Sequence, residues 1–278
     1  MTKIHILADD LTGALDSVAE VPVMAPVHAG TQRYPVEALI TGLRDIRRDD
    51  LPDRLNSIMP WFEKADFCIK KVDSLLRGNT FDEVAWVARA GRFRQIVFTP
   101  AFPKLGRVTF DLHHWLSTST DASNSTALTP IDNPSLQTKQ ALGKPHCVEG
   151  GDSEQLQQAL MQDTPSNTLS MFDLSPTVRL TADAASALRS AQISTLIHKL
   201  PKPGALFVIG GDTFLDIVQA SGANTIVAGP SVRAGWGYAR LQGGLWDGVI
   251  CHSRSGAFGD DDDLVAMVRI VNCATTLI

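Results

Sequence analysis

The sequence predicts an α/β protein of two lobes, each a mainly parallel sheet flanked by helices. Short apolar runs recur along the chain, as at Ile4–Ala8 and Ala205–Ile209, and such runs are typical of strands buried on both faces. Each run ends in a polar or glycine-containing stretch, and most of these stretches lead into a segment with helical spacing of its apolar residues. This alternation of strand, loop and helix is the pattern of parallel βαβ units.

The first part of the chain holds most of the expected elements. We expect strands at Ile4–Ala8, Val36–Leu43, Phe67–Val72, Gln95–Thr99 and Leu169–Phe172. We expect helices at 14–19, 51–59, 80–91, 136–142, 154–161 and 181–197. Residues that favour helix starts support three of these boundaries, namely Asp49 or Asp50, Asn79 or Thr80, and Thr181. The polar stretch Ser117–Ser135 is predicted to be a long surface loop or a mobile flap.

A boundary at Pro201–Gly204 divides the chain into residues 1–197 and 198–278. Beyond it we expect strands at Ala205–Ile209, Thr225–Ala228 and Val249–His252, and helices at 214–220 and 264–271. The glycine-rich stretch Gly229–Gly244 is predicted to be loop.

The composition indicates a globular protein and argues against several classes of function. The 278 residues are 44% apolar and 20% charged, with a net charge of −5, which is typical of a soluble chain with an ample core. The mild acidity argues against nucleic-acid binding, and no apolar run approaches the roughly 20 residues of a membrane span. None of the four cysteines forms a CxxC pair and no secretory signal is recognisable, so we expect reduced cysteines and a cytoplasmic location.

Two adjacent carboxylates, Asp9 and Asp10, follow the first apolar run. Ligands of open α/β sheets bind at the carboxyl ends of the strands, so a fixed carboxylate there could be a general base, a ligand contact or a magnesium ligand. The alternative is a helix N-cap beside a solvated neighbour.

The stretch Lys70–Asn79 concentrates hydrogen-bond donors after another expected strand. A loop that enters a helix offers backbone N–H groups to an anion. Arg77 adds a planar fork suited to a carboxylate or phosphate, and Ser74 adds a hydroxyl. We interpret this stretch as an anion site; the alternative is an ordinary capped turn with surface charge.

Lys104 and Arg107 lie in Pro100–Arg107, just past the strand expected at Gln95–Thr99, and therefore on the same presumed ligand side. The adjacent His113 and His114 could act in acid–base chemistry, but one of them is as readily explained by packing. No His or Cys cluster shows ligand spacing, so no metal site is predicted.

Three glycine stretches follow the later apolar runs, at Gly210–Thr213, Gly229–Gly237 and Ser255–Gly259. Glycine lets the backbone approach phosphate closely, and a helix start supplies the donors. None matches the Walker or dinucleotide pattern. Three such stretches favour a nucleotide-type ligand over plain turns, whereas Asp260–Asp263 is better explained as a solvated helix start than as a magnesium site.

Taken together, these motifs resemble the four-carbon acid sugar kinase family, whose members phosphorylate threonate, erythronate or oxo-tetronate with ATP. The matching stretches are Ala8–Asp16, Lys70–Asn79, Pro100–Arg107, Gly210–Thr213 and Arg254–Asp262. They occur in family order and span nearly the whole chain.

The resemblance implies a sugar-acid domain at 1–197, a nucleotide domain at 198–278 and a ligand cleft between them. Asp9 and Asp10 then match the catalytic carboxylates at the substrate. The substrate-binding residues that it implies are Arg47 (as the arginine within 44–47), Ser74, Leu75, Leu76, Arg77, Lys104 and Arg107. The nucleotide-binding residues are Gly210, Gly211, Asp212, Thr213, Ser255, Gly256 and Gly259. The implied cofactors are ATP and Mg²⁺.

The chain also departs from the family pattern. Family members are usually longer, and the first part of the usual nucleotide domain, with its Ser-rich loop, has no counterpart here. Arg254 stands where a lysine is usual, and Leu112 where a glycine is usual. The expected reaction is ATP-dependent phosphorylation of a sugar-acid hydroxyl. The alternatives are a divergent member that binds the acid without phosphoryl transfer, and a subunit completed by another chain or in a homodimer.

Overall fold

The computed structural model describes residues 2–19, 25–27, 34–91, 93, 95–100, 107–110, 113–116, 146–149, 170–174, 176, 178–256 and 262–275. By packing, the chain divides into two compact units. Unit 1 comprises Met1–Leu128, Thr225–Ser231 and Gly237–Ala239, and unit 2 comprises Thr129–Asn224, Val232–Trp236 and Arg240–Ile278. The sequence predicts a different division, into a sugar-acid domain at 1–197 and a nucleotide domain at 198–278. That division is defined by the ligand that each part is expected to bind, and it stays a prediction.

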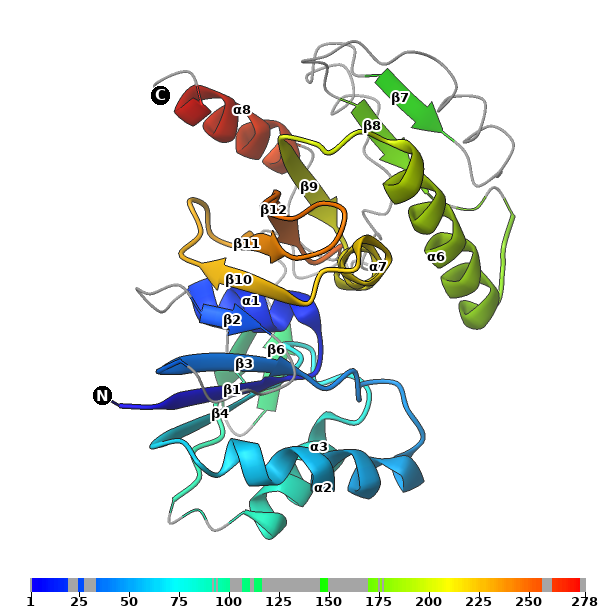
Figure 1. The fold of residues 1–278 in the computed structure, drawn as a ribbon. Helices are drawn as coiled ribbons and strands as arrows, with labels where there is room; N and C mark the ends of the chain where they lie inside the picture. Colours follow the sequence, from blue (N-terminus) through cyan, green and yellow to red (C-terminus); the bar gives the residue numbers. More distant parts are fainter. Residues whose placement is uncertain are drawn as a thin grey trace. The chain divides into compact units, whose positions relative to one another are not determined.

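Unit 1 is built on a mainly parallel sheet with the strand order β4-β1-β3-β2-β10 (Figure 1). Its strands are β1 (Ile4–Ala8), β2 (Ala25–Val27), β3 (Val36–Ile40), β4 (Phe67–Lys71) and β10 (Thr225–Gly229). β1 pairs in parallel with β3 on one side and with β4 on the other. β2 runs parallel to β3, and β10 pairs antiparallel with β2.

Helices cover both faces of this sheet (Figure 1). α1 (Leu11–Ala19) packs on one face, and α2 (Leu51–Phe62) and α3 (Thr80–Ala90) lie on the other. A 3-10 turn, η1 (Arg48–Asp50), leads into α2. A short antiparallel pair, β5 (Arg107–Phe110) and β6 (His113–Leu116), also belongs to this unit.

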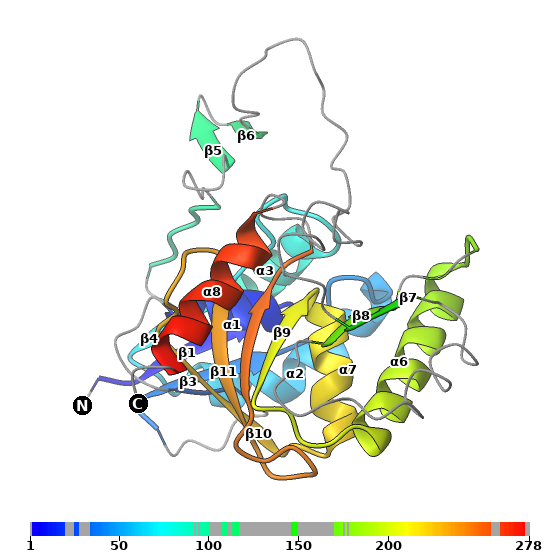
Figure 2. The same cartoon turned by 90° about the horizontal axis from the view of Figure 1, so that it is seen from above.

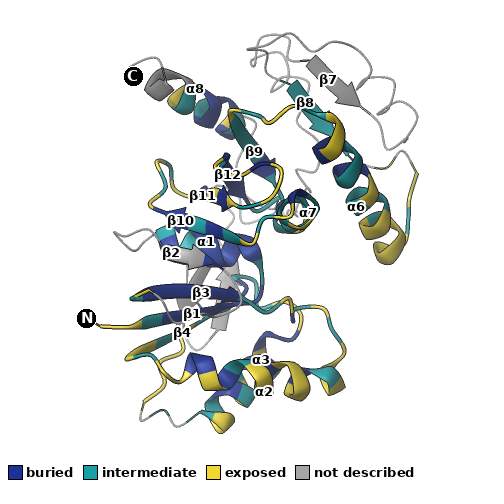
Figure 3. Ribbon diagram, in the orientation of Figure 1, coloured by how far each residue is buried: buried dark blue, intermediate teal, exposed yellow. Residues whose placement is uncertain are grey.

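The core of unit 1 follows from the alternation of side chains along β1 and β3. Leu7 and Leu39 are register partners and point to the same face. There they pack with the apolar side of α2, including Leu55 and Phe62. Ile6 and its neighbours on the other face are equally buried, which explains why the sequence of this strand is a continuous apolar run (Figure 3).

Unit 2 contains β9 (Ala205–Ile209) and β12 (Ile250–Arg254) as a parallel pair. Its other described elements are β7 (His146–Glu149), β8 (Ser170–Asp173), α6 (Ala182–Lys199), α7 (Gly211–Ser221) and α8 (Asp263–Thr275). α6 and α7 lie side by side (Figure 2), and Arg189 of α6 donates to Asp216 of α7 at 2.7 Å. β11 (Gly237–Gln242) has its first half in unit 1 and its second half in unit 2.

The protein is therefore an α/β protein with a mainly parallel sheet flanked by helices, as the sequence predicts. The strands expected at Ile4–Ala8 and Ala205–Ile209 are confirmed with those bounds. Thr181 is confirmed as the N-cap of α6, since its side chain accepts from the Ala184 amide at 3.3 Å. Two expectations are wrong: Gln95–Thr99 forms no strand, and Gly229–Gly244 is not all loop because it contains β11.

Some expectations fall outside the described residues, namely the loop at Ser117–Ser135 and the helices at 136–142 and 154–161. Within the part of the chain that is described, no helix combines the length and apolarity needed to span a membrane.

Candidate functional site

The carboxyl ends of three parallel strands of unit 1 bring the predicted acidic and basic stretches together. Asp9 and Asp10 follow β1, Arg44 lies in the loop after β3, and Asp73–Arg77 follows β4. Because β1 lies between β3 and β4, these three loops leave the sheet at one edge. From β1 the chain passes to β3 on one side of β1 and later to β4 on the other side. Open α/β sheets bind ligands at such a switch point, where the strand order reverses.

Arg44 is the centre of this group. Its Nε donates to Asp9 Oδ2 at 2.8 Å, and its Nη2 forms ion pairs with Asp10 Oδ2 and, at 3.6 Å, with Asp73 Oδ1. Burial lowers the pKa of Arg44, but Asp10 and Asp9 outweigh it, so the pKa is raised further above its usual value. One guanidinium therefore joins the loops after β1 and β4.

Asp10 has a second role at the start of α1. Its Oδ1 accepts from the Gly13 amide at 2.5 Å and from the Thr12 hydroxyl at 3.2 Å. This is the helix N-cap that the sequence allowed as an alternative. A Cβ on Gly13 would lie 2.8 Å from Asp10 Oδ1 and 3.3 Å from Lys71 Cγ, so this position has room only for glycine.

Asp9 differs from Asp10 because part of its carboxylate is left without a partner. Its side chain is only 2% exposed. Oδ2 binds Arg44, whereas the buried Oδ1 has no hydrogen-bond partner among the described residues. Buried polar atoms in native proteins are almost always bonded, so this oxygen at a ligand-binding edge is a candidate contact for a ligand group.

Asp73 organises the loop after β4. Its Oδ2 accepts from the amides of Leu75 and Arg77 and from Arg77 Nε, each at 3.0 Å, and its Oδ1 accepts from Arg77 Nη2 at 2.7 Å. The Leu76 amide donates to the Asp73 carbonyl at 2.9 Å. The amides expected to hold a ligand anion at 75–77 are thus used within the loop, and the Asp73 carboxylate takes the anion's place.

The electrostatics of Asp73 follow from these contacts. Burial raises the pKa of a carboxyl, but the hydrogen bonds from the Arg77 side chain and amide outweigh that effect, with Arg44 adding to them. The pKa of Asp73 is therefore held well below its usual range. Asp73 is ionised at neutral pH although its side chain is only 5% exposed.

Gly78 and Asn79 attach this loop to the loop that carries Arg44. The Asn79 amide donates to the Arg44 carbonyl at 3.0 Å, and Asn79 Nδ2 donates to the carbonyls of Leu43 and Ile46 at 2.9 and 2.7 Å. Gly78 has a φ of +61°, and a Cβ there would lie 2.2 Å from the Arg44 carbonyl oxygen. Asn79 is therefore at the N-cap position of α3, as predicted, but its side chain holds the neighbouring loop.

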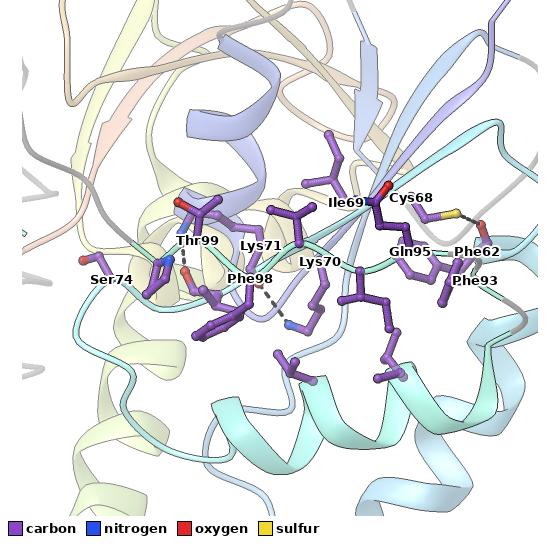
Figure 4. Close-up of a pocket in the computed structure, with 17 residues that line it drawn as sticks. Phe62, Cys68, Ile69, Lys70, Lys71, Ser74, Phe93, Gln95, Phe98 and Thr99 are labelled. Atoms are coloured by element: carbon purple, nitrogen blue, oxygen red, sulfur yellow. Dashed lines mark hydrogen bonds between the residues drawn. The ribbon is translucent and has the colours of Figure 1, made fainter. Parts of the chain in front are cut away.

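A cavity of about 400 Å³ lies in the same unit between β4, α3 and residues 95–100 (Figure 4). Most of its lining is apolar, with Lys70, Lys71 and Ser74 among the polar side chains. Lys70 forms a 3.0 Å ion pair with Glu83 of α3, whose side chain is 1% exposed. The lining does not match a polar sugar acid, so the candidate site is the charged group at the strand ends.

The predicted nucleotide-binding stretches lie next to one another in unit 2. Gly210 connects β9 to α7, and Ser255 and Gly256 follow β12, the parallel neighbour of β9. The Gly210 amide donates to the Arg254 carbonyl at 2.8 Å. Gly210 has a φ of +107°, and a Cβ there would lie 3.3 Å from Thr213 Oγ1. These stretches place glycine backbone at the N-terminus of an 11-residue helix, which suits a phosphate group.

Arg254 itself is buried within unit 2 and faces protein groups. Its Nη1 donates to Asp263 Oδ2 at 2.8 Å, and its guanidinium lies 5.6 Å from the Trp236 ring centroid. Asp263 also accepts from Arg233 at 2.6 Å and from the Trp236 indole at 2.9 Å. This network fastens the start of α8 beside the end of β12.

Comparison with known families finds a match over more than half of the chain, with residues from both units. Residues 4–198 match the family described as the sugar-binding N-terminal domain. The chain belongs to this family. The match includes the whole charged group of the sugar-binding domain, from Asp9 to Arg77.

Two solved structures resemble this chain in fold. A proposed tRNA synthase of Salmonella typhimurium LT2 is 15% identical with a TM-score of 0.67, over 95% of this chain and 98% of that one. A Haemophilus influenzae protein of the DUF1537 family is 12% identical with a TM-score of 0.59, over 93% of this chain and 97% of that one. At these identities the likeness concerns the fold. No curated protein matches the chain.

The sugar-binding domain brings Asp9, Asp10 and Arg77 together, but it does not include Arg47. The Arg47 side chain is 86% exposed and pairs with Asp50 at 3.2 Å. Its place in the group is taken by Arg44, which the sequence did not single out. Ser74 lines the apolar cavity, and Leu76 has a φ of +57° in the loop that Asp73 organises.

The structure does not describe the side chains of three further predicted site residues. Lys104 and Gly259 lie outside the described residues, and Arg107 is described only as the first residue of β5. In the residues that are described, no three His, Cys, Asp or Glu side chains form a group suited to a metal ion.

Proposed function

We propose that this protein is an ATP-dependent kinase that phosphorylates a hydroxyl of a four-carbon sugar acid of the threonate, erythronate or oxo-tetronate type. The observation that carries this proposal is the charged group at the switch point of a sugar-binding domain, with the buried Asp9 Oδ1 left without a partner. We also propose a cytoplasmic location and homodimer formation, with no nucleic acid as partner.

The carboxylate of the acid would bind the exposed side of Arg77. Its guanidinium has five N–H groups, and Nε and Nη2 are directed at Asp73. The side chain is 50% exposed, so the opposite edge can meet a ligand. Arg44 and Lys71 add positive charge near the acidic side chains at this edge.

The hydroxyl to be phosphorylated would donate its hydrogen bond to Asp9 Oδ1, which neighbouring side chains cover until the acid binds. This bond would satisfy the orphan oxygen and orient the nucleophile, and Asp9 could accept its proton as phosphoryl transfer proceeds. Asp10 is less suited to this role, because one of its oxygens caps α1 and the other binds Arg44. Catalysis of phosphoryl transfer rests mostly on positioning and charge neutralisation.

The phosphates of ATP would bind at Gly210, Gly211 and Thr213 together with Ser255 and Gly256. The first amides of α7 have no partner within the helix, and Gly210 leaves open the space that a Cβ would fill. When bound, ATP supplies the transferred phosphoryl group, and its Mg²⁺ is held largely by phosphate oxygens and water. Asp212 is an exposed carboxylate in the first turn of α7 that could reach the ion.

A second candidate function is sugar-acid binding without phosphoryl transfer. It is favoured by Arg254, which stands where a lysine is usual in the family and is engaged by Asp263 inside unit 2. The observations on unit 1 support both functions equally.

The test is ADP release measured across four-carbon sugar acids, with Asp9→Asn as the impaired variant and Arg47→Gln as the control. We expect ADP release that requires a sugar acid, that falls by about 100-fold or more in Asp9→Asn and that is unchanged in Arg47→Gln. Sugar-acid binding without ADP release would favour the second function. No binding of any four-carbon acid would overturn both.

A further inference from the structure

Asp73 is a buried anion around which the loop after β4 is built. Four donors converge on its two carboxylate oxygens, two of them from the Arg77 side chain. Arg44 Nη2 approaches the same carboxylate at 3.6 Å. The carboxylate lies inside the loop, with a side chain that is 5% exposed, whereas the Arg77 side chain is 50% exposed.

This arrangement fixes which edge of Arg77 faces outward. A guanidinium held by Nε and Nη2 in a fork cannot rotate without losing both bonds. The remaining N–H groups then point away from Asp73. An exposed arginine without such a partner would lose side-chain conformational entropy when it binds a ligand. Because Asp73 already orders the Arg77 side chain in the free protein, most of this entropy loss does not occur on binding.

Asp73 also allows two guanidinium groups to lie close together. Arg44 and Arg77 repel each other, and Arg44 tends to lower the pKa of Arg77, but Asp73 raises that pKa more strongly, through hydrogen bonding first and charge second. The carboxylate between them offsets the repulsion. Both positive groups can then remain at the ligand-binding edge.

We propose that Asp73 is a positioning residue for ligand recognition, which orients Arg77 toward the carboxylate of the bound acid without touching the acid. This inference rests on the proposed sugar-acid site and gives a role to Asp73, which lies in the motif Lys70–Asn79 but is not among its predicted substrate-binding residues. It also specifies how Arg77 binds: through the edge opposite Asp73.

The experiment compares the dissociation constants of threonate and erythronate, measured by calorimetry without ATP, in the full-length protein. The variants are Asp73→Asn, Arg77→Ala and the double variant. We expect each single variant to bind about tenfold more weakly or worse, and the double variant to bind no more weakly than Arg77→Ala alone. Asp50→Asn is the matched control, because Asp50 also pairs with an arginine but on the exposed surface.

A purely structural role for Asp73 would make the losses additive, and this result would overturn the inference. An unchanged dissociation constant in Asp73→Asn would also overturn it. Should Asp73→Asn fail to fold, Arg77→Lys decides, since lysine keeps the charge but cannot form the fork: we expect a loss close to that of Arg77→Ala, and wild-type affinity would contradict the inference. If the unaltered protein binds no four-carbon acid, the proposed function fails first.

Discussion

The main-chain amide of Asn79 donates a 3.0 Å hydrogen bond to the carbonyl oxygen of Arg44. This bond ties the loop after β4 to the loop after β3, and it therefore sets where the Arg44 side chain begins. From there the guanidinium reaches Asp9, Asp10 and Asp73. The geometry of the candidate site thus depends on a backbone contact between the loop that carries Asp73 and the loop that carries Arg44.

The close approach of these loops predicts a large cost for Gly78→Ala. The new Cβ would lie 2.2 Å from the Arg44 carbonyl oxygen at a φ of +61°, so strain and overpacking combine to about 3 kcal/mol of unfolding free energy or more. Gly42→Ala is the control, because Gly42 has a φ of +64° with nothing within 4 Å, and it should lose only about 1 kcal/mol. Urea unfolding checks both, and equal losses would contradict the packing of the two loops.

The lowered pKa of Asp73 predicts a loss of stability in acid. Its folded pKa is below its usual value because the hydrogen bonds from Arg77 outweigh burial, so the unfolded chain takes up the proton first as the pH falls. The stability from this group is present above about pH 3.9, the ordinary value for aspartate, and is lost below it. The difference in unfolding free energy between the wild type and Asp73→Asn should therefore stay constant from pH 7 to about 5 and shrink as the pH falls below about 3.9. A difference that stays constant down to about pH 3 would contradict the shift.

The buried pair Lys70–Glu83 predicts strong coupling between two substitutions. Removing one partner leaves an isolated buried charge, so Lys70→Met or Glu83→Leu alone should cost about 3–5 kcal/mol of unfolding free energy. The double variant should be more stable than either single variant, because no charge is left behind. Additive losses in a double-mutant cycle would show that the pair is exposed to solvent.

The two arginines Arg44 and Arg47 predict opposite outcomes for the same substitution. Arg44→Gln removes the cation that joins three carboxylates, so sugar-acid binding should weaken by about tenfold or more. Arg47→Gln removes a surface pair, which is worth at most about 1 kcal/mol, and should leave binding unchanged. Calorimetric titration of both variants distinguishes them, and a larger effect at Arg47 would show that the charged group is not the site.

The sequence predicts the strands of this protein well where burial is continuous. The bounds of β1 follow from an apolar run that is buried on both faces. The position of Asp9 and Asp10 follows as well, because a strand end in a parallel sheet is identifiable from the run alone. The shared edge with Asp73–Arg77 follows from the parallel order of β1 and β4.

The choice between Arg44 and Arg47 could not be made from the sequence. Both lie in one basic stretch, and their directions depend on the loop conformation. That conformation is held by Asn79, whose Nδ2 bonds the carbonyls of Leu43 and Ile46. Such a contact joins residues far apart in the chain, so it cannot be inferred from the spacing of neighbouring residues.

The two errors in strand prediction have different causes. Gln95–Thr99 has the apolar character of a strand, but it forms no ladder, and its side chains Ile96, Val97 and Phe98 are exposed and not packed as in a buried strand. The strand β11 was missed because it lies within a glycine-rich stretch, which is more typical of a loop. Its alternation of buried Ala239 and Leu241 with exposed Arg240 and Gln242 was a usable signal for a strand with one buried face.

A crystal structure of the protein with bound threonate or erythronate tests the central claim most directly. We expect electron density with the acid's carboxylate against the outward edge of Arg77, and one hydroxyl within hydrogen-bond distance of Asp9 Oδ1. Ligand density elsewhere in the molecule, with the edge at Asp9 and Arg77 empty, would contradict the claim that these side chains form the sugar-acid site.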